Sequence, residues 1–302
     1  MQKKVTRLAW AALAALLLAA GLAAARPAPA RADEAMLWRA VSPEGRELYL
    51  LGSVHMARTS FYPLKPVINE AFDRSGTLVL ELDPESEDIQ GTLTIMLDKG
   101  TYDPPDNLML HLDPELRVLL EAQAENLPGG VECPFKPWLA AVTLSVTILE
   151  RLGYIVKEGV DRHFLAKARE RGMPFVELET AEEQLGVFAD MSEQESMLFL
   201  KATLLELKDV ETFMDELVGA WIAGDEAKFE EAFFSTYVAW PDLAPLLDRV
   251  VFDRNQTMYR RLLPHLNGAG PPVFAVIGSG HLVGSRGIPA LFAGAGWRLE
   301  KF

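Results

Sequence analysis

Short apolar runs alternate with longer amphipathic stretches along this chain. The apolar runs predict β-strands near residues 37–41, 47–51, 77–82, 174–179 and 273–277. The turn-forming sequence Ser42-Pro43-Glu44-Gly45 joins the first two strands into a hairpin. The run Val273 to Ile277 is apolar at every position, which is typical of a central strand that is covered on both faces.

Apolar residues at helical spacing predict the remaining elements. Thr180 and Glu183 fit a capping box for a helix after the strand 174–179. We expect an α/β fold (α+β-like) with a small mixed central sheet from both ends of the chain and a large helical layer from the middle. Residues 33–302 are predicted to form a single domain, within which residues 185–265 could be a helical lid. The other predicted helices span 63–74, 112–125, 137–152, 159–171, 192–218, 222–235 and 241–264.

Residues 1–32 have the layout of a signal peptide. Lys3, Lys4 and Arg7 precede an apolar run of eighteen residues, and a segment with Pro27 and Pro29 follows it. Small residues around Arg31 predict cleavage after Ala32 and export to the bacterial periplasm. The alternative is an uncleaved N-terminal membrane anchor, since eighteen apolar residues can just span a bilayer.

Net charge and cysteine count limit which partners and covalent links the chain can have. Removing residues 1–32 takes away five basic and no acidic residues, which moves the formal charge from −14 to −19. Such an acidic surface argues against nucleic acid and anionic lipid, so we expect no nucleic-acid partner and no membrane contact after cleavage. The single cysteine, Cys133, has no partner for a disulfide and is interpreted as structural. The sequence leaves the oligomeric state open.

Two GxxH segments follow strands at opposite ends of the chain. They are Gly52-Ser53-Val54-His55 and Gly278-Ser279-Gly280-His281. Glycine lets the backbone turn sharply, so each histidine reaches the carboxyl edge of the sheet, where open α/β sheets bind ligands. One histidine after a strand is more often a hydrogen-bonding residue than a ligand. Two of the five histidines in this same context favour a shared site.

Glu81 is a carboxylate within an otherwise apolar strand, where a charge needs a partner. One interpretation is an ion pair with an arginine, or a strand end that reaches solvent. The other is that Glu81 joins His55 and His281 as ligands of a catalytic divalent metal. Such a metal lowers the pKa of a bound water and supplies a hydrolytic nucleophile. The chain has no HExxH, CxxC, GxSxG or complete dinucleotide loop.

A set of ordered segments gives a more specific signal than either GxxH alone. The segments are Leu50-Leu51-Gly52-Ser53-Val54-His55, Leu80-Glu81-Leu82-Asp83, Gly159-Val160-Asp161 with Phe164, Leu178-Glu179-Thr180 with Glu182-Glu183-Gln184, Arg254-Asn255, and Val276 to Gly284. With these segments, the chain after residue 32 resembles the TraB/GumN (TraB/PrgY/GumN) family and is similar to the protease domain of the Tiki proteins.

The resemblance implies a fold shared with erythromycin-esterase and ChaN-like proteins, and a peptidase activity that depends on manganese or cobalt. It places His55, Glu81 and His281 as metal ligands, and it matches the motif arginine of the family to Arg254. We therefore predict these four as catalytic residues, with Arg254 neutralising Glu81 or holding a substrate carboxylate. Ser53 stands where threonine is common, a change that keeps the hydroxyl.

Two functions follow as hypotheses. The first is a metal-dependent hydrolase, a peptidase that acts on peptides or proteins in the periplasm. The alternative is a non-catalytic periplasmic protein that sequesters a peptide, haem or metal in the same groove, because ChaN-like relatives bind haem.

Overall fold

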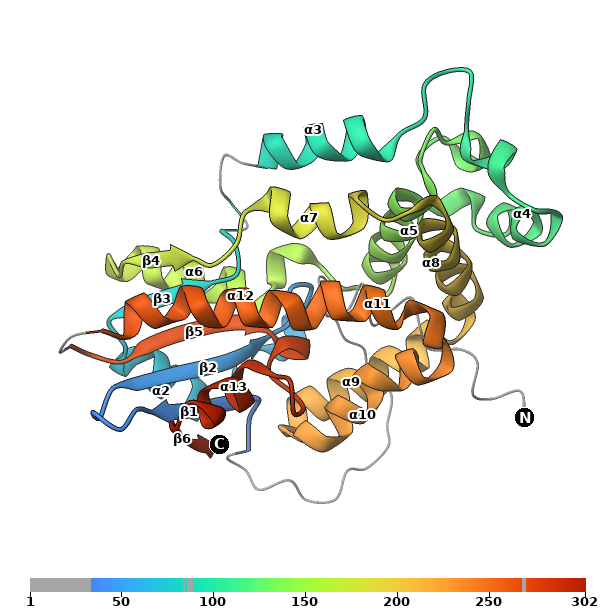
Figure 1. Cartoon of the computed structure of the whole chain (residues 1–302). Helices are drawn as coiled ribbons and strands as arrows, with labels where there is room; N and C mark the ends of the chain where they lie inside the picture. The colour runs from blue at the N-terminus through green and yellow to red at the C-terminus, as the bar shows by residue number, and fades with distance from the viewer. Residues whose placement is uncertain (1–33, 84, 86–88, 268–269) are drawn as a thin grey trace.

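A mixed sheet of six strands forms the centre of the molecule, with strand order β4-β3-β5-β2-β1-β6 (Figure 1). The structure is a computed structural model that describes residues 34–83, 85, 89–267 and 270–302. The predicted signal peptide therefore lies outside the described residues. The strands are β1 (Leu37–Val41), β2 (Glu47–Ser53), β3 (Thr77–Leu80), β4 (Phe175–Glu177), β5 (Val273–Gly278) and β6 (Arg298–Lys301).

The central part of the sheet is parallel and brings the two ends of the chain together. β5 pairs with β2 on one side and with β3 on the other, and both pairings are parallel. Ser53 is opposite Gly278, so the two GxxH turns leave the sheet side by side. β5 is buried at every position, as its uniformly apolar sequence predicts. The predicted α/β class, with a mixed sheet from both chain ends, is confirmed.

Helices from the middle of the chain supply most of the remaining structure. α2 and α6 cover one face of the sheet, whereas α12 and α13 pack together on the other face (Figure 1). The helices are α2 (Pro66–Arg74), α3 (Ile89–Gly100), α4 (Pro114–Glu121), α5 (Pro137–Arg151), α6 (Val160–Arg171), α7 (Ala181–Ala189), α8 (Glu193–Glu206), α9 (Val210–Ala223), α10 (Glu226–Ala239), α11 (Ala244–Leu247), α12 (Asp253–Leu262) and α13 (Ile288–Gly294).

Two of the predicted helices are each divided. The predicted helix 192–218 consists of α8 and α9, which are separated by a 3₁₀ turn at Leu207–Asp209. α9 runs on to Gly224, which is left-handed with φ 75° and approaches the backbone of Glu34 too closely for a Cβ atom. The predicted helix 241–264 begins with a 3₁₀ turn at Pro241–Leu243 and continues as α11, a π-helix at Asp248–Phe252, and α12; a second 3₁₀ turn begins at Leu263. Apolar spacing alone does not reveal such changes of helical phase.

The apolar pattern of the sequence predicts neither β6 nor α13. β6 is an edge strand of four residues, Arg298–Lys301, with two exposed and two partly buried positions. Its charged residues resemble a solvated segment, and charges are also how proteins protect an exposed sheet edge. No helix in the described part of the chain is long and apolar enough to cross a membrane.

An aromatic cluster fastens α2 and α6 to the sheet. Phe274 of β5 is fully buried, with its ring centroid 5.5 Å from that of Phe72 and 5.0 Å from that of Phe164. Phe72 and Phe164 also contact each other, at 5.0 Å. The cluster fixes the position of α6, whose first turn carries a residue of the site described below.

We predict that Phe274→Ala lowers the free energy of unfolding by roughly 3–5 kcal/mol, because the cavity adjoins two other rings in a packed core. Urea unfolding followed by circular dichroism measures the change. Leu93→Ala on α3 is the control: Leu93 is 55% exposed, and its removal should change stability by less than about 0.5 kcal/mol. Equal effects of the two substitutions would contradict the prediction.

Candidate functional site

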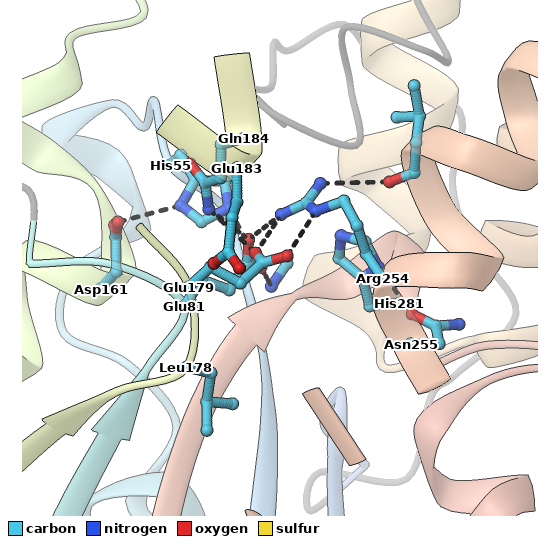
Figure 2. Close-up of polar contacts among 12 residues, drawn as sticks. His55, Glu81, Asp161, Leu178, Glu179, Glu183, Gln184, Arg254, Asn255 and His281 are labelled. Carbon is cyan, nitrogen blue, oxygen red and sulfur yellow. Dashed lines mark hydrogen bonds and ion pairs between the residues drawn. The ribbon is translucent and has the colours of Figure 1, made fainter. Parts of the chain in front are cut away.

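The carboxyl ends of three neighbouring parallel strands bring His55, Glu81 and His281 to one edge of the sheet (Figure 2). Glu81 directly follows β3, and His55 comes two residues after β2. His281 ends the 3₁₀ helix Ser279–His281 that follows β5. The sheet therefore places the three side chains together, as the strand pattern predicted, although β3 ends one residue before Glu81.

His55 lies between two carboxylates. Its Nδ1 is 2.9 Å from Oδ2 of Asp161, and its Nε2 is 3.7 Å from Oε1 of Glu81. Asp161 is in the first turn of α6, and the N–H of Val160 next to it donates to the carbonyl of Val54. Burial by itself lowers the pKa of His55, but the Asp161 and Glu81 carboxylates outweigh it and raise the pKa to about 10.

The surroundings of His281 lower its pKa, whereas those of His55 raise it. Its side chain is fully buried, and its Nδ1 is 2.7 Å from Oδ1 of Asn255. Burial, together with the nearby Arg254 guanidinium, lowers the pKa of His281 to about 3. The imidazole is therefore neutral near pH 7. Its Nε2 is buried without a hydrogen-bond partner among the described residues.

Glu81 is held from several directions. Its Oε1 accepts a hydrogen bond from the N–H of Gly278, at the end of β5. Its Oε2 accepts one from Nη2 of Arg254 at 2.7 Å and one from Nε2 of Gln184 at 3.3 Å. Burial opposes ionisation of Glu81, but the two histidines and Arg254 outweigh it and hold its pKa below the usual range.

Arg254 joins two carboxylates across the site. Its Nε and Nη2 donate to Oε1 and Oε2 of Glu179 at 2.9 and 2.6 Å, a bidentate pair, while Nη2 also reaches Glu81. Its Nη1 donates to the carbonyl of Val250 at 3.1 Å. All three charged side chains are nearly inaccessible to solvent. Arg254 thus neutralises Glu81, one of the two roles that the sequence suggested, and it is already committed to protein carboxylates.

α12 supplies two successive residues of the site. Arg254 reaches Glu81 and Glu179, while Asn255 reaches His281. The π-helix Asp248–Phe252 directly precedes α12 and changes the helical phase. The carbonyl of Val250, within this π-helix, is the one that accepts from Arg254. The irregular turn therefore also helps to fix the arginine.

The side chains present match the donor types that hold divalent metals. Two imidazoles and a carboxylate are suitable ligands, and each imidazole is oriented through Nδ1 by a second side chain. The unpartnered, buried Nε2 of His281 fits such a role. Oε2 of Glu81 is occupied by Arg254 and Gln184, so only Oε1 faces His55. Among the described residues, no three or more His, Cys, Asp or Glu side chains form a preassembled metal-binding group.

Three of the supporting side chains, Asp161, Gln184 and Asn255, are not singled out by their local sequence. Each lies in one of the segments on which the family resemblance rests. What marks them is their shared order along the chain, because nothing in their local sequence distinguishes them from surface polar residues.

Fold and site together define an α/β protein with a buried His/Glu/Arg constellation at the carboxyl edge of its parallel strands. The chain belongs to the TraB/PrgY/gumN family, whose model matches residues 36–301. It is similar to the uncharacterized protein YbaP of Escherichia coli, with 23% identity over 84% of this chain and 92% of that protein. The YbaP protein of Shigella flexneri matches to the same extent. No solved structure gives a significant match.

We predict that Arg254→Met destabilises the fold by about 3–5 kcal/mol near pH 8, because two carboxylates stay buried without their cation. The loss should be smaller at pH 5. The guanidinium is one of the groups that lower the pKa of Glu81, so this pKa is higher in the variant than in the wild type. Folded variant protein therefore takes up a proton at a higher pH, and its deficit in stability shrinks as the pH falls. Unfolding in urea at the two pH values measures this.

The double variant Arg254→Met/Glu179→Gln is the matched control for that experiment. Removing one of the two carboxylates should restore part of the lost stability at pH 8. A single variant as stable as the wild type, or a loss that grows toward pH 5, would contradict the prediction.

Proposed function

We propose that this chain is a metal-dependent hydrolase, a peptidase that acts on peptides or proteins in the periplasm after removal of residues 1–32. His55, Glu81 and His281 are the proposed ligands, and manganese or cobalt is the expected metal. Membership of the TraB/PrgY/gumN family supports the comparison with Tiki-type peptidases. The arrangement of His55 and Glu81 is the observation that carries the proposal.

His55 and Glu81 face each other in a way that calls for a positive charge between them. Because Asp161 accepts the proton on Nδ1, a neutral His55 directs the Nε2 lone pair toward Oε1 of Glu81, itself an acceptor. Their separation of 3.7 Å is too long for a hydrogen bond. It is close to the roughly 3–3.6 Å between two ligand atoms of one metal. Either a proton on His55 or a shared cation satisfies the pair.

Each surrounding residue has a role in this proposal. Asp161 holds the ring of His55, and Asn255 holds the ring of His281. Arg254 balances the charge of Glu81 and Glu179 and keeps Oε1 of Glu81 turned toward His55. A bound divalent metal would polarise a carbonyl group and lower the pKa of a water molecule.

One observation favours the alternative of a periplasmic binding protein. His281, Glu81 and Arg254 are 0%, 4% and 6% exposed, and a closed site is more typical of a metal that is held than of one that turns over substrate. Of the occupants considered, a metal ion fits this enclosure better than a peptide or haem, since a fully buried His281 leaves no open face for a macrocycle.

A peptide-library cleavage assay on residues 33–302, with and without added manganese, tests the proposal. We expect cleavage that depends on manganese and falls more than about a hundredfold in Glu81→Gln and His55→Ala, because each removes a ligand. Glu182→Gln is the matched control: this glutamate is exposed on α7, two residues from Gln184, and its variant should keep full activity.

Metal content and haem titration separate the two functions. Metal bound by the wild type and lost in His55→Ala, without cleavage of any peptide, would favour sequestration. A Soret band that His55→Ala or His281→Ala abolishes would indicate a haem carrier. A wild type that binds no divalent metal, together with a fully active His55→Ala variant, would overturn the hydrolase proposal.

A further inference from the structure

The amide of Asn255 has only one orientation that satisfies its neighbours. Its Nδ2 is 2.9 Å from the backbone carbonyl of Arg286, in the segment between β5 and α13. A backbone carbonyl can only accept, so the NH₂ group must be on this side. The amide oxygen, Oδ1, is consequently turned toward His281. Asn255 is fully buried on α12, so its amide group is shielded from solvent.

The orientation of the amide decides where His281 carries its proton. Oδ1 of Asn255 can only accept, and it is 2.7 Å from Nδ1 of His281, so this nitrogen is the donor. A neutral imidazole has one N–H, which leaves a lone pair on Nε2. That Nε2 is buried and has no hydrogen-bond partner among the described residues.

We propose that Asn255 is a positioning residue that fixes His281 as the Nδ1–H tautomer and presents its Nε2 lone pair to the candidate site. The chain of contacts runs from the Arg286 carbonyl through the Asn255 amide to the imidazole. The tautomer is a property of the protein alone, whereas its use in binding a metal rests on the function proposed above.

The two histidines are thus oriented by partners of different charge. His55 has the Asp161 carboxylate, and His281 has a neutral amide. An amide sets the tautomer as well as a carboxylate does, but it adds no negative charge to a site that already holds Glu81 and Glu179 against Arg254. With asparagine at position 255, His281 is oriented as a ligand without an added charge, whereas the Asp161 carboxylate strengthens His55 as a ligand.

Nitrogen-15 NMR of the histidine side chains in metal-free protein, residues 33–302, tests the proposal directly. The His281 signals are assigned by their loss in His281→Ala. We expect the chemical shifts of a proton on Nδ1 and a bare Nε2 at pH 7. The backbone carbonyl of Val251 also interacts with this ring. A proton on Nε2 would overturn the proposal.

Two variants separate tautomer control from mere packing. Asn255→Leu removes the acceptor, so the Nδ1–H preference should be lost. Asn255→Asp keeps an oxygen toward His281 but sets another against the Arg286 carbonyl, so stability falls while the Nδ1–H tautomer remains. Arg286→Ala is the control, because Asn255 donates to the backbone carbonyl of Arg286, which this substitution keeps, so the His281 shifts should stay unchanged. Two position-255 variants with identical His281 shifts would contradict the inference.

Manganese titration then tests the link to the proposed function. Asn255→Leu should weaken manganese binding about 10–100-fold, the usual effect of losing a residue that orients a metal ligand, and Asn255→Asp should bind at least as tightly as the wild type. If the tautomer is as expected but the wild type binds no manganese, the positioning role stands and the metal-dependent function fails. Equal manganese affinity in wild type and Asn255→Leu would show that the tautomer does not serve metal binding.

Discussion

Arg254 lies between two buried carboxylates, and the site depends on this one ion-pair network. Its guanidinium ties α12 to Glu179 at the start of the α7 segment and to Glu81 at the end of β3. Burying three charges is costly unless each is paired and hydrogen-bonded, and here Gln184 and the Gly278 N–H complete the set. Because the network leaves Oε1 of Glu81 facing His55, the same interaction that stabilises the interior determines what the site can bind.

Much of the fold can be predicted from the sequence, because buried elements have simple patterns of apolar residues. The all-apolar run of β5 indicates a central strand, and glycines followed by histidines indicate the sheet edge where His55 and His281 emerge. β6 and the change of helical phase before α12 cannot be predicted in this way. A charged edge strand resembles a solvated segment, and a single π-helical turn is too short to produce a period of its own in the apolar pattern.

In the candidate site, too, some residues can be predicted from the sequence and others cannot. His55, Glu81 and His281 follow from strand ends, since parallel strands deliver their carboxyl ends to one edge. Asp161, Glu179 and Asn255 come from helices and loops whose placement depends on tertiary packing, such as the aromatic cluster that seats α6. Individual polar residues of this kind are indistinguishable from solvated ones until the layers are assembled.

The parallel pairing of β2 with β5 joins segments more than two hundred residues apart. During synthesis, β2 can pair with β1 early, but its edge toward β5 stays unpaired until more than two hundred further residues have been made. Parallel pairing between such distant segments closes a long loop, which makes assembly slow and leaves an unpaired strand edge exposed for longer. A chain that is cut short before β5 has neither this central strand nor His281. His55, Glu81 and His281 can therefore meet at this edge only after residue 281 has been made.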